Sequence, residues 1–253
     1  MRFWVAITLL CTLFICTSLA SAQVGPSDAR KPIPAHPAAV PSVIVIGFVG
    51  GFVKHDDGSH LEVQLAERLR KSYPSNAYVR TFENHHRGRA HREILRILDR
   101  DHDHQLTPGE RQQARIIIYG HSWGGSETIA LARELEKENI PVLLTVQVDS
   151  VSKLGQKDSI VPSNVAEAIN FYQANGFLHG RSEIRAADPA STRILGNVRM
   201  DYKEHPSACD LCRWYANPFM KTHLEIECDP TVWGQIEHLI RSQLDPLVEE
   251  SHL

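Results

Sequence analysis

The chain has 253 residues, of which 42% are hydrophobic and 23% are charged, a composition that suits one domain with a substantial core and excludes a fibrous or disordered protein. Its formal net charge is −3 and its basic residues form no cluster, so we do not expect it to bind nucleic acid.

The first 22 residues have the features of a signal peptide. Arg2 precedes an apolar run from Phe3 through Ile15, and Ala20-Ser21-Ala22 supplies the small residues that signal peptidase requires. The apolar run is shorter than the roughly 20 residues of a membrane-spanning helix. We therefore expect cleavage after Ala22, export to the periplasm or the medium, and no stable membrane span afterwards.

Residues 23–41 are rich in Pro and Ala without apolar periodicity, which predicts an extended arm ahead of a domain over residues 42–253. In that domain, apolar runs of strand length alternate with segments of helical periodicity. Strands are expected at Val43–Phe48, Tyr78–Phe82, Ile116–Tyr119, Val142–Val148 and Arg193–Tyr202. Helices are expected at Leu61–Tyr73, Ala90–Leu98, Ser126–Glu138, Val165–Ala174 and Thr231–Leu244. This alternation predicts an α/β fold whose mostly parallel sheet has helices on both faces.

A Gly-x-Ser-x-Gly motif, Gly120 to Gly124, lies between a predicted buried strand and a predicted helix. That context is typical of a nucleophile elbow, in which the serine occupies a sharp, strained turn and its neighbours two positions away must be small. Ser122 is therefore the candidate nucleophile. The N–H of Trp123, at the N-terminus of the following helix, is a candidate oxyanion donor.

A serine nucleophile needs a histidine base and an acid that orients it, in the chain order serine, acid, histidine. Asp149 ends the strand that follows the elbow and is the first candidate for the acid, with Asp188 as the alternative. His223, in a predicted loop before the closing helix, is the candidate base, and His205 is the alternative.

The second oxyanion donor is expected in the glycine-rich segment after the first strand, Ile46 through Phe52. The backbone N–H of Phe48 or Val49 is the candidate. Two polar segments also follow predicted strands and are expected to overhang the site, namely His55-Asp56-Asp57 and Asn84-His85-His86-Arg87.

These features resemble the α/β-hydrolase superfamily, in particular its lipase-like and esterase-like branch. The resemblance covers about Val43 to Leu244 and implies Ser122, Asp149 and His223 as the triad, with no catalytic cofactor. It implies a small-molecule or lipid-like ester as substrate. Ile46 stands where common lipases have the histidine of a His-Gly signature, so this element of the pattern is absent.

An acidic segment over residues 99–110 matches the calcium loop of EF-hands. The matching ligands are Asp99, Asp101, Asp103, the backbone carbonyl of Gln105, and Glu110. The segment departs from the motif at His104, where a glycine normally makes the sharp turn. A structural Ca²⁺ is expected here, and the alternative is that Glu110 only caps a helix together with Thr107.

After signal cleavage, the remaining cysteines are Cys209, Cys212 and Cys228. In an exported protein we expect one disulfide from Cys209 or Cys212 to Cys228, which would fix the segment that carries His223. The sequence thus predicts an exported serine hydrolase that cleaves an ester-like bond. The alternative is a non-catalytic, calcium-binding interaction protein on the same fold.

Overall fold

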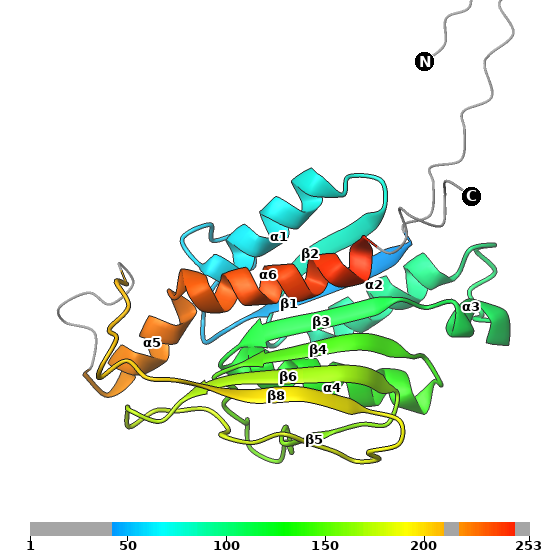
Figure 1. Ribbon diagram of the computed structural model, residues 1–253. Coiled ribbons are helices and arrows are strands. Elements are labelled where there is room, and N and C mark those ends of the chain that lie inside the picture. The colour runs from blue at the N-terminus through cyan, green and yellow to red at the C-terminus, as the bar shows by residue number, and fades with distance from the viewer. Residues whose placement is uncertain (1–41, 210–217, 246–253) are drawn as a thin grey trace, which may run out of the picture. The chain divides into compact units, whose positions relative to one another are not determined.

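The structure is a computed structural model that describes residues 42–209 and 218–245 (Figure 1). The predicted signal peptide and arm, residues 1–41, lie outside the described residues. Within the described part of the chain, no helix is both long and apolar enough to cross a membrane.

Six parallel strands form the central sheet in the order β2-β1-β3-β4-β6-β8. Their bounds are β1 Val43–Val49, β2 Ala77–Glu83, β3 Ile116–His121, β4 Val142–Val148, β6 Val165–Gln173 and β8 Arg193–Met200. Two short strands, β5 Ile160–Val161 and β7 Arg185–Ala186, pair with each other apart from this sheet. The central strands are apolar and mostly buried, as expected for a parallel sheet covered on both faces.

Helices cover both faces of the sheet, which confirms the predicted α/β class (Figure 1). Helices α1 (Leu61–Ser72) and α6 (Pro230–Leu244) pack on one face, and α2 (Arg87–Leu98) and α4 (Trp123–Lys137) pack on the other. The short helices are α3 (Pro108–Gln112), the 3₁₀ turn η1 (Pro218–Met220) and α5 (Lys221–Glu227).

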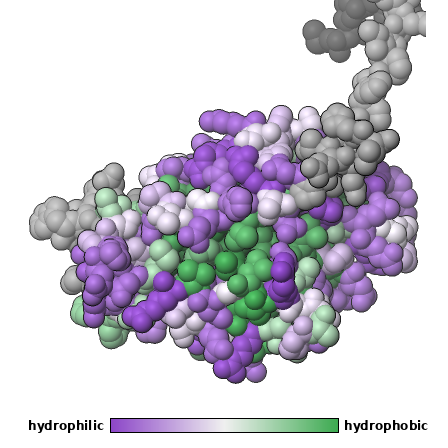
Figure 2. All heavy atoms as spheres, in the orientation of Figure 1, coloured by the Kyte–Doolittle hydropathy of each residue, from purple (hydrophilic) through white to green (hydrophobic). Residues whose placement is uncertain are grey.

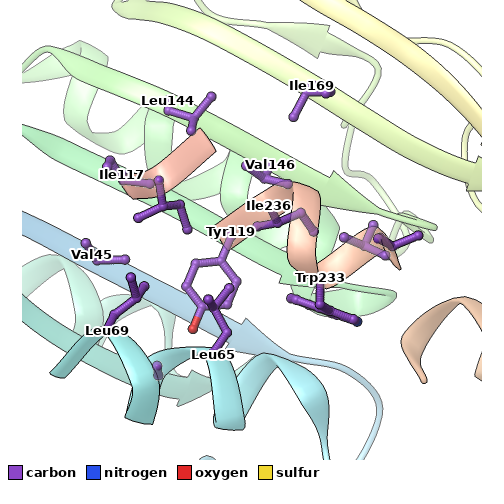
Figure 3. Close-up of a cluster of buried hydrophobic side chains, with 14 of the residues drawn as sticks. Val45, Leu65, Leu69, Ile117, Tyr119, Leu144, Val146, Ile169, Trp233 and Ile236 are labelled. Carbon is purple, nitrogen blue, oxygen red and sulfur yellow. The ribbon is translucent and has the colours of Figure 1, made fainter. Parts of the chain in front are cut away.

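The core under α1 and α6 is built around two large aromatic side chains, Tyr119 and Trp233 (Figure 3). Their rings meet edge to face with centroids 6.2 Å apart. Each also donates a hydrogen bond to a backbone carbonyl, from the Tyr119 hydroxyl to Glu62 (2.9 Å) and from the Trp233 indole to Glu227 (2.6 Å). The core therefore holds the backbones of two buried glutamates as well as apolar side chains.

Part of this face is open between α6 and the edge strand β8. Figure 2 shows apolar side chains at the surface there, over β4, β6 and β8. Residues packed against the core but only partly buried include Leu143, Leu195 and Val198. The two helices on this face thus cover the sheet less completely at its β8 end.

The strand order places the carboxyl ends of β1 and β3 side by side at a topological switch point. From β1 the chain crosses to β2 on one side and then returns to β3 on the other. In open α/β sheets, ligands bind in the crevice at such a point, outside the carboxyl ends of the strands. Ser122 follows β3 directly, so it lies at this position.

The helix predicted at Val165–Ala174 is wrong, because this segment forms β6 between β4 and β8. The prediction took Pro162-Ser163-Asn164 as a helix start. Instead, the Asn164 amide donates hydrogen bonds to the carbonyls of Ala132 (3.0 Å) and Ile140 (2.9 Å), which fixes a strand entry. Periodicity alone does not separate a short buried strand from a buried helix.

Candidate active site

The turn from β3 into α4 has the strained geometry of a nucleophile elbow. Ser122 has φ 56° and ψ −123°, and its N–H donates to the carbonyl of Val148 (2.9 Å). A Cβ on Gly120 would lie 2.5 Å from the carbonyl oxygen of Gly124, and one on Gly124 would lie 2.2 Å from that of Phe48. Neither position accepts a side chain, so the two glycines of the motif are required by the packing of β1, β3 and α4.

His223 lies against Ser122, with 2.8 Å between its Nε2 and the serine Oγ. The residue was predicted to be in a loop, and that prediction is wrong, because His223 belongs to α5. His205, the alternative base, is exposed at the surface. A helix fixes the backbone of His223 more firmly than a loop would, and this limits the directions that its side chain can take.

Asp149 completes the chain of hydrogen bonds, with 2.6 Å between its Oδ2 and Nδ1 of His223. It stands directly after β4 with φ 41°. Its Oδ1 accepts from the N–H of Gly180 (2.7 Å), and its Oδ2 accepts from the Gln173 side-chain amide (2.9 Å). Asp188, the alternative acid, is half-buried, and its side chain bonds only within its own turn, to Ala190 and Ser191.

The three side chains are nearly inaccessible to water, since Ser122 is 8% exposed, His223 2% and Asp149 0%. A carboxylate with this set of donors accepts the hydrogen from Nδ1 of His223. The Nε2 lone pair then faces the hydroxyl of Ser122, as a general base requires. The arrangement can therefore remove the serine proton during attack on a carbonyl carbon.

Two residues that hold Asp149 were not predicted from the sequence. Gln173 lies at the end of β6, which was assigned to a helix, so its place at the carboxyl edge of the sheet was not foreseen. Gly180 packs so closely that an added Cβ would lie 2.2 Å from the backbone of Asp149. Its signal was an isolated glycine in an irregular segment, which alone indicates little.

His121, the residue before the nucleophile, was also missed. It is buried, and its ring lies 4.7 Å from the ring of His223 with an interplanar angle of 34°. Burial lowers the pKa of His121 to about 4, so the imidazole is uncharged at neutral pH. An uncharged neighbour does not oppose the positive charge that His223 acquires when it takes a proton.

The predicted oxyanion residues lie on both sides of the elbow. Trp123 is the first residue of α4, and its ring contacts that of Phe52 with centroids 5.7 Å apart. Phe48 and Val49 are fully buried inside β1. Gly50, which follows them, lies close to Ser122, since an added Cβ there would be 3.1 Å from Cβ of Ser122.

Exposed apolar side chains gather on the loops at this edge of the sheet. We call five of them the apolar rim: Phe52 after β1, Leu154 after β4, Phe177 after β6, and Phe219 and Met220 before α5. Phe52 and Phe177 are 96% and 83% exposed. The rings of Phe177 and Phe219 meet edge to face at 5.3 Å. In the described ranges, one other large apolar side chain is exposed, that of Ile160 (40%).

The polar segment around His55 and His86 forms a small cluster on Glu83 at the end of β2. Nδ1 of His55 lies 2.8 Å and Nδ1 of His86 2.7 Å from the two carboxylate oxygens. Although burial opposes it, these hydrogen bonds lower the pKa of Glu83 to about 2. The side chains thus satisfy one another at the surface.

The acidic loop brings three of the five predicted calcium ligands together, and Glu110 is not in this group. Carboxylate oxygens of Asp99, Asp101 and Asp103 lie within 4.8 Å of one another. His104, at the position of the usual glycine, has φ 65°, a left-handed conformation. Glu110 accepts from the N–H groups of Arg100 and Thr107 (both 2.8 Å), and with Thr107 it forms the capping box. Gln105, the remaining predicted ligand, donates its backbone N–H to Oδ1 of Asp103 (2.7 Å).

A disulfide joins Cys209 to Cys228, with 5.3 Å between the Cα atoms. It confirms the predicted bond to Cys228. Cys212, the alternative partner, lies outside the described residues. Cys228 follows α5 directly, so the disulfide fixes the end of the helix that carries His223.

Comparison with known proteins gives only remote structural matches. No protein-family model matches the chain, and neither does any curated protein sequence. A cutinase-like protein from Cryptococcus sp. superposes with a TM-score of 0.40 and 13% identity over 82% of this chain and 97% of that chain. An esterase/lipase from an uncultured bacterium gives 0.42 and 10% over 82% and 79%, and an acetylxylan esterase gives 0.40 and 11% over 81% and 99%. At these levels of similarity, the chemistry has to be argued from the geometry of this chain.

Proposed function

We propose that the protein is an exported serine hydrolase that cleaves ester bonds through an acyl-enzyme. Ser122 is the nucleophile, His223 the general base and acid, and Asp149 the residue that orients His223. One observation carries the proposal: the continuous path from Ser122 Oγ through the His223 ring to Asp149, with distances of 2.8 and 2.6 Å.

In this mechanism, Nε2 of His223 takes the hydroxyl proton as Ser122 Oγ attacks the carbonyl carbon of the ester. The same proton then passes to the leaving alcohol oxygen as the ester C–O bond breaks. Water then attacks the acyl carbon while His223 takes one of its protons. That proton passes to Ser122 Oγ as the bond between Oγ and the acyl group breaks and the acid leaves. Asp149 stays ionised throughout and holds the Nδ1–H.

The N–H of Trp123 is one proposed oxyanion donor, because it begins α4 directly after Ser122. The close approach of Gly50 to Ser122 favours the turn after β1 as the source of the second. The Asn84 side chain holds this turn by donating to the carbonyl of Gly51. For this donor we favour the turn over the N–H groups of Phe48 and Val49 inside β1.

A fluorophosphonate probe tests the proposal, because it forms a covalent bond only with an activated serine. We expect the wild-type protein to be labelled at Ser122 and the Ser122→Ala variant not to be labelled. The matched control is Ser191→Ala, which removes an exposed serine and is expected to leave labelling unchanged. Failure to label the native protein would favour the non-catalytic, calcium-binding alternative.

The apolar rim supports an ester with a long or aromatic acyl group as substrate. An acyl group that binds against exposed rings is removed from water, which favours binding. Among apolar side chains, aromatic rings offer the largest contact area for this. We expect Phe177→Ser to lower kcat/KM for an octanoate ester by about 10-fold. This loss corresponds to part of the free energy of transferring one phenyl ring from water to an apolar contact. Hydrolysis of an acetate ester should change little. The measurement is a series of p-nitrophenyl esters of increasing acyl length.

Ile160→Ser is the control for this series, because Ile160 is exposed but lies outside the apolar rim. An equal loss for acetate and octanoate in Phe177→Ser would mean that the rim does not select the acyl group.

The calcium site in the acidic loop stays a prediction. If Asp99, Asp101 and Asp103 bind Ca²⁺ in the folded state, a 100-fold excess over Kd should raise the melting temperature by about 5 °C. Asp101→Asn should reduce that rise, because it removes one ligand charge at the surface. Scanning calorimetry with chelator-treated protein measures both. If millimolar Ca²⁺ gives no heat and no change in melting temperature, the calcium site is wrong and Glu110 only caps the helix.

A further inference from the structure

A second polar cluster lies beneath the candidate active site and plays no part in the proposed chemistry. It consists of His60 at the N-terminus of α1, Glu62 in the first turn of α1, and Glu227 at the end of α5. An imidazole nitrogen and one oxygen from each carboxylate all lie within 4.8 Å of one another. The side chains of His60 and Glu227 are 12% and 3% exposed, and Glu62 is fully buried.

Glu62 is the unusual member of this cluster. Neither of its carboxylate oxygens has a hydrogen-bond partner among the described residues. A buried, unpaired carboxylate is strongly unfavourable unless a proton or a cation neutralises it. His60 pairs with Glu227 through Nδ1 and Oε1, and no ion pair involves Glu62 among the described residues.

His121 borders the same cluster. Its Nδ1 is buried, lies 3.5 Å from an oxygen of Glu227, and has no hydrogen-bond partner in the described ranges. Nε2 of His121 lies 3.2 Å from the carbonyl oxygen of His223 and donates to it, so Nδ1 carries a lone pair. Two buried groups that could each donate electrons are thus left unpaired at one place.

The donor set indicates which cation would fit. Imidazole nitrogen with carboxylate oxygen is typical of sites for Zn²⁺ and related divalent transition metals, whereas Ca²⁺ and Mg²⁺ take oxygen ligands almost exclusively. Metal-binding histidines commonly direct their second nitrogen towards a carboxylate. Nε2 of His60 lies 3.8 Å from Asp57.

The surroundings hold the donors in place. The Tyr119 hydroxyl and the Trp233 indole, both in the core of Figure 3, donate to the backbone carbonyls of Glu62 and Glu227. A binding group whose backbone is fixed in this way loses little conformational entropy when it binds an ion.

We propose that His60, Glu62 and Glu227 form a buried structural site for one divalent transition-metal ion, best matched by Zn²⁺. The ion would join the start of α1 to the end of α5. Glu227 lies one helical turn after His223, and His121 packs on its ring. The site would thereby fix the helix that presents the candidate base, without contact with substrate.

The test uses the full purified chain, made metal-free by dialysis against dipicolinic acid and titrated with ZnCl₂. We expect one Zn²⁺ per chain by calorimetry and by elemental analysis. A rise in melting temperature of about 5 °C or more is expected at a 100-fold excess over Kd. Glu62→Gln keeps the shape of the side chain but removes a ligand, and should weaken binding by at least about 100-fold. Asp101→Asn in the acidic loop is the control and should bind Zn²⁺ as the wild type does.

Co²⁺ provides a measurement on the wild type that does not depend on any variant folding. We expect one equivalent to give a visible d–d band without the sulfur-to-metal charge-transfer band of a cysteine site. No stoichiometric Zn²⁺ binding, unchanged binding in Glu62→Gln, or a sulfur charge-transfer band would overturn the proposal. In the first two cases, Glu62 would be neutralised by a proton.

Discussion

Replacing Ser122 by alanine is expected to lower kcat for ester hydrolysis by about 10⁴- to 10⁶-fold, as loss of the nucleophile does in serine hydrolases that use a triad. The substitution removes only the hydroxyl that donates a hydrogen bond to Nε2 of His223. The cramped turn between Gly120 and Gly124 accepts alanine as it accepts serine, because the two side chains share the same Cβ. We therefore expect the melting temperature to change by less than about 3 °C, within the range of a mild substitution.

Steady-state kinetics on an octanoate ester, together with scanning calorimetry, measures both quantities. Ser191→Ala, at an exposed serine, serves as the control and should match the wild type. A Ser122→Ala variant that kept more than about 1% of wild-type kcat would mean that another group attacks the ester, since triad residues act as a unit.

The elbow could be predicted because its determinants are local. A buried strand, two glycines four positions apart and a helix suffice to place Ser122, and the structure shows the close contacts that exclude any side chain at both glycines. Asp149 could be placed at the same edge for a similar reason, because it ends the neighbouring parallel strand. Both placements follow from the order of elements along the chain.

The segment Val165–Gln173 could not be assigned from its own residues. Its structure is set by β4 and β8, which pair with it on either side and bury it. These contacts override a local pattern that also suits a helix. Because the helix was predicted, Gln173 was not expected at the carboxyl edge of the sheet, where its amide bonds Asp149.

The cluster of His60, Glu62 and Glu227 could not be predicted from the sequence either. Its members come from two helices separated by more than half of the chain, so no ligand spacing marks them as a set. Only the fold brings α1 and α5 together over the core. The predicted calcium loop shows the opposite case, because its acidic residues lie within one short segment and can be recognised by spacing.

Asp149→Asn is expected to lower kcat by about 10⁴-fold through the tautomer of His223, with some loss of stability because the Gln173 amide loses its acceptor at Oδ2. The oxygen of the new amide should take the place of Oδ1, because the N–H of Gly180 donates to that position at 2.7 Å. The amide NH₂ then faces Nδ1 of His223, which has to accept a hydrogen bond instead of donating one. The ring proton moves to Nε2, and the lone pair that should receive the proton of Ser122 is lost.

Asp188→Asn is the matched control, because Asp188 is the rival acid in the sequence and bonds only within its own exposed turn. We expect it to retain wild-type kcat. The pH dependence of the residual activity distinguishes a loss of His223 orientation from misfolding of the variant. In Asp149→Asn, residual activity should rise with increasing pH, since hydroxide can replace the missing base, whereas a misfolded variant would lose activity at every pH. Equal losses in the two variants would exclude Asp149 as the residue that orients His223.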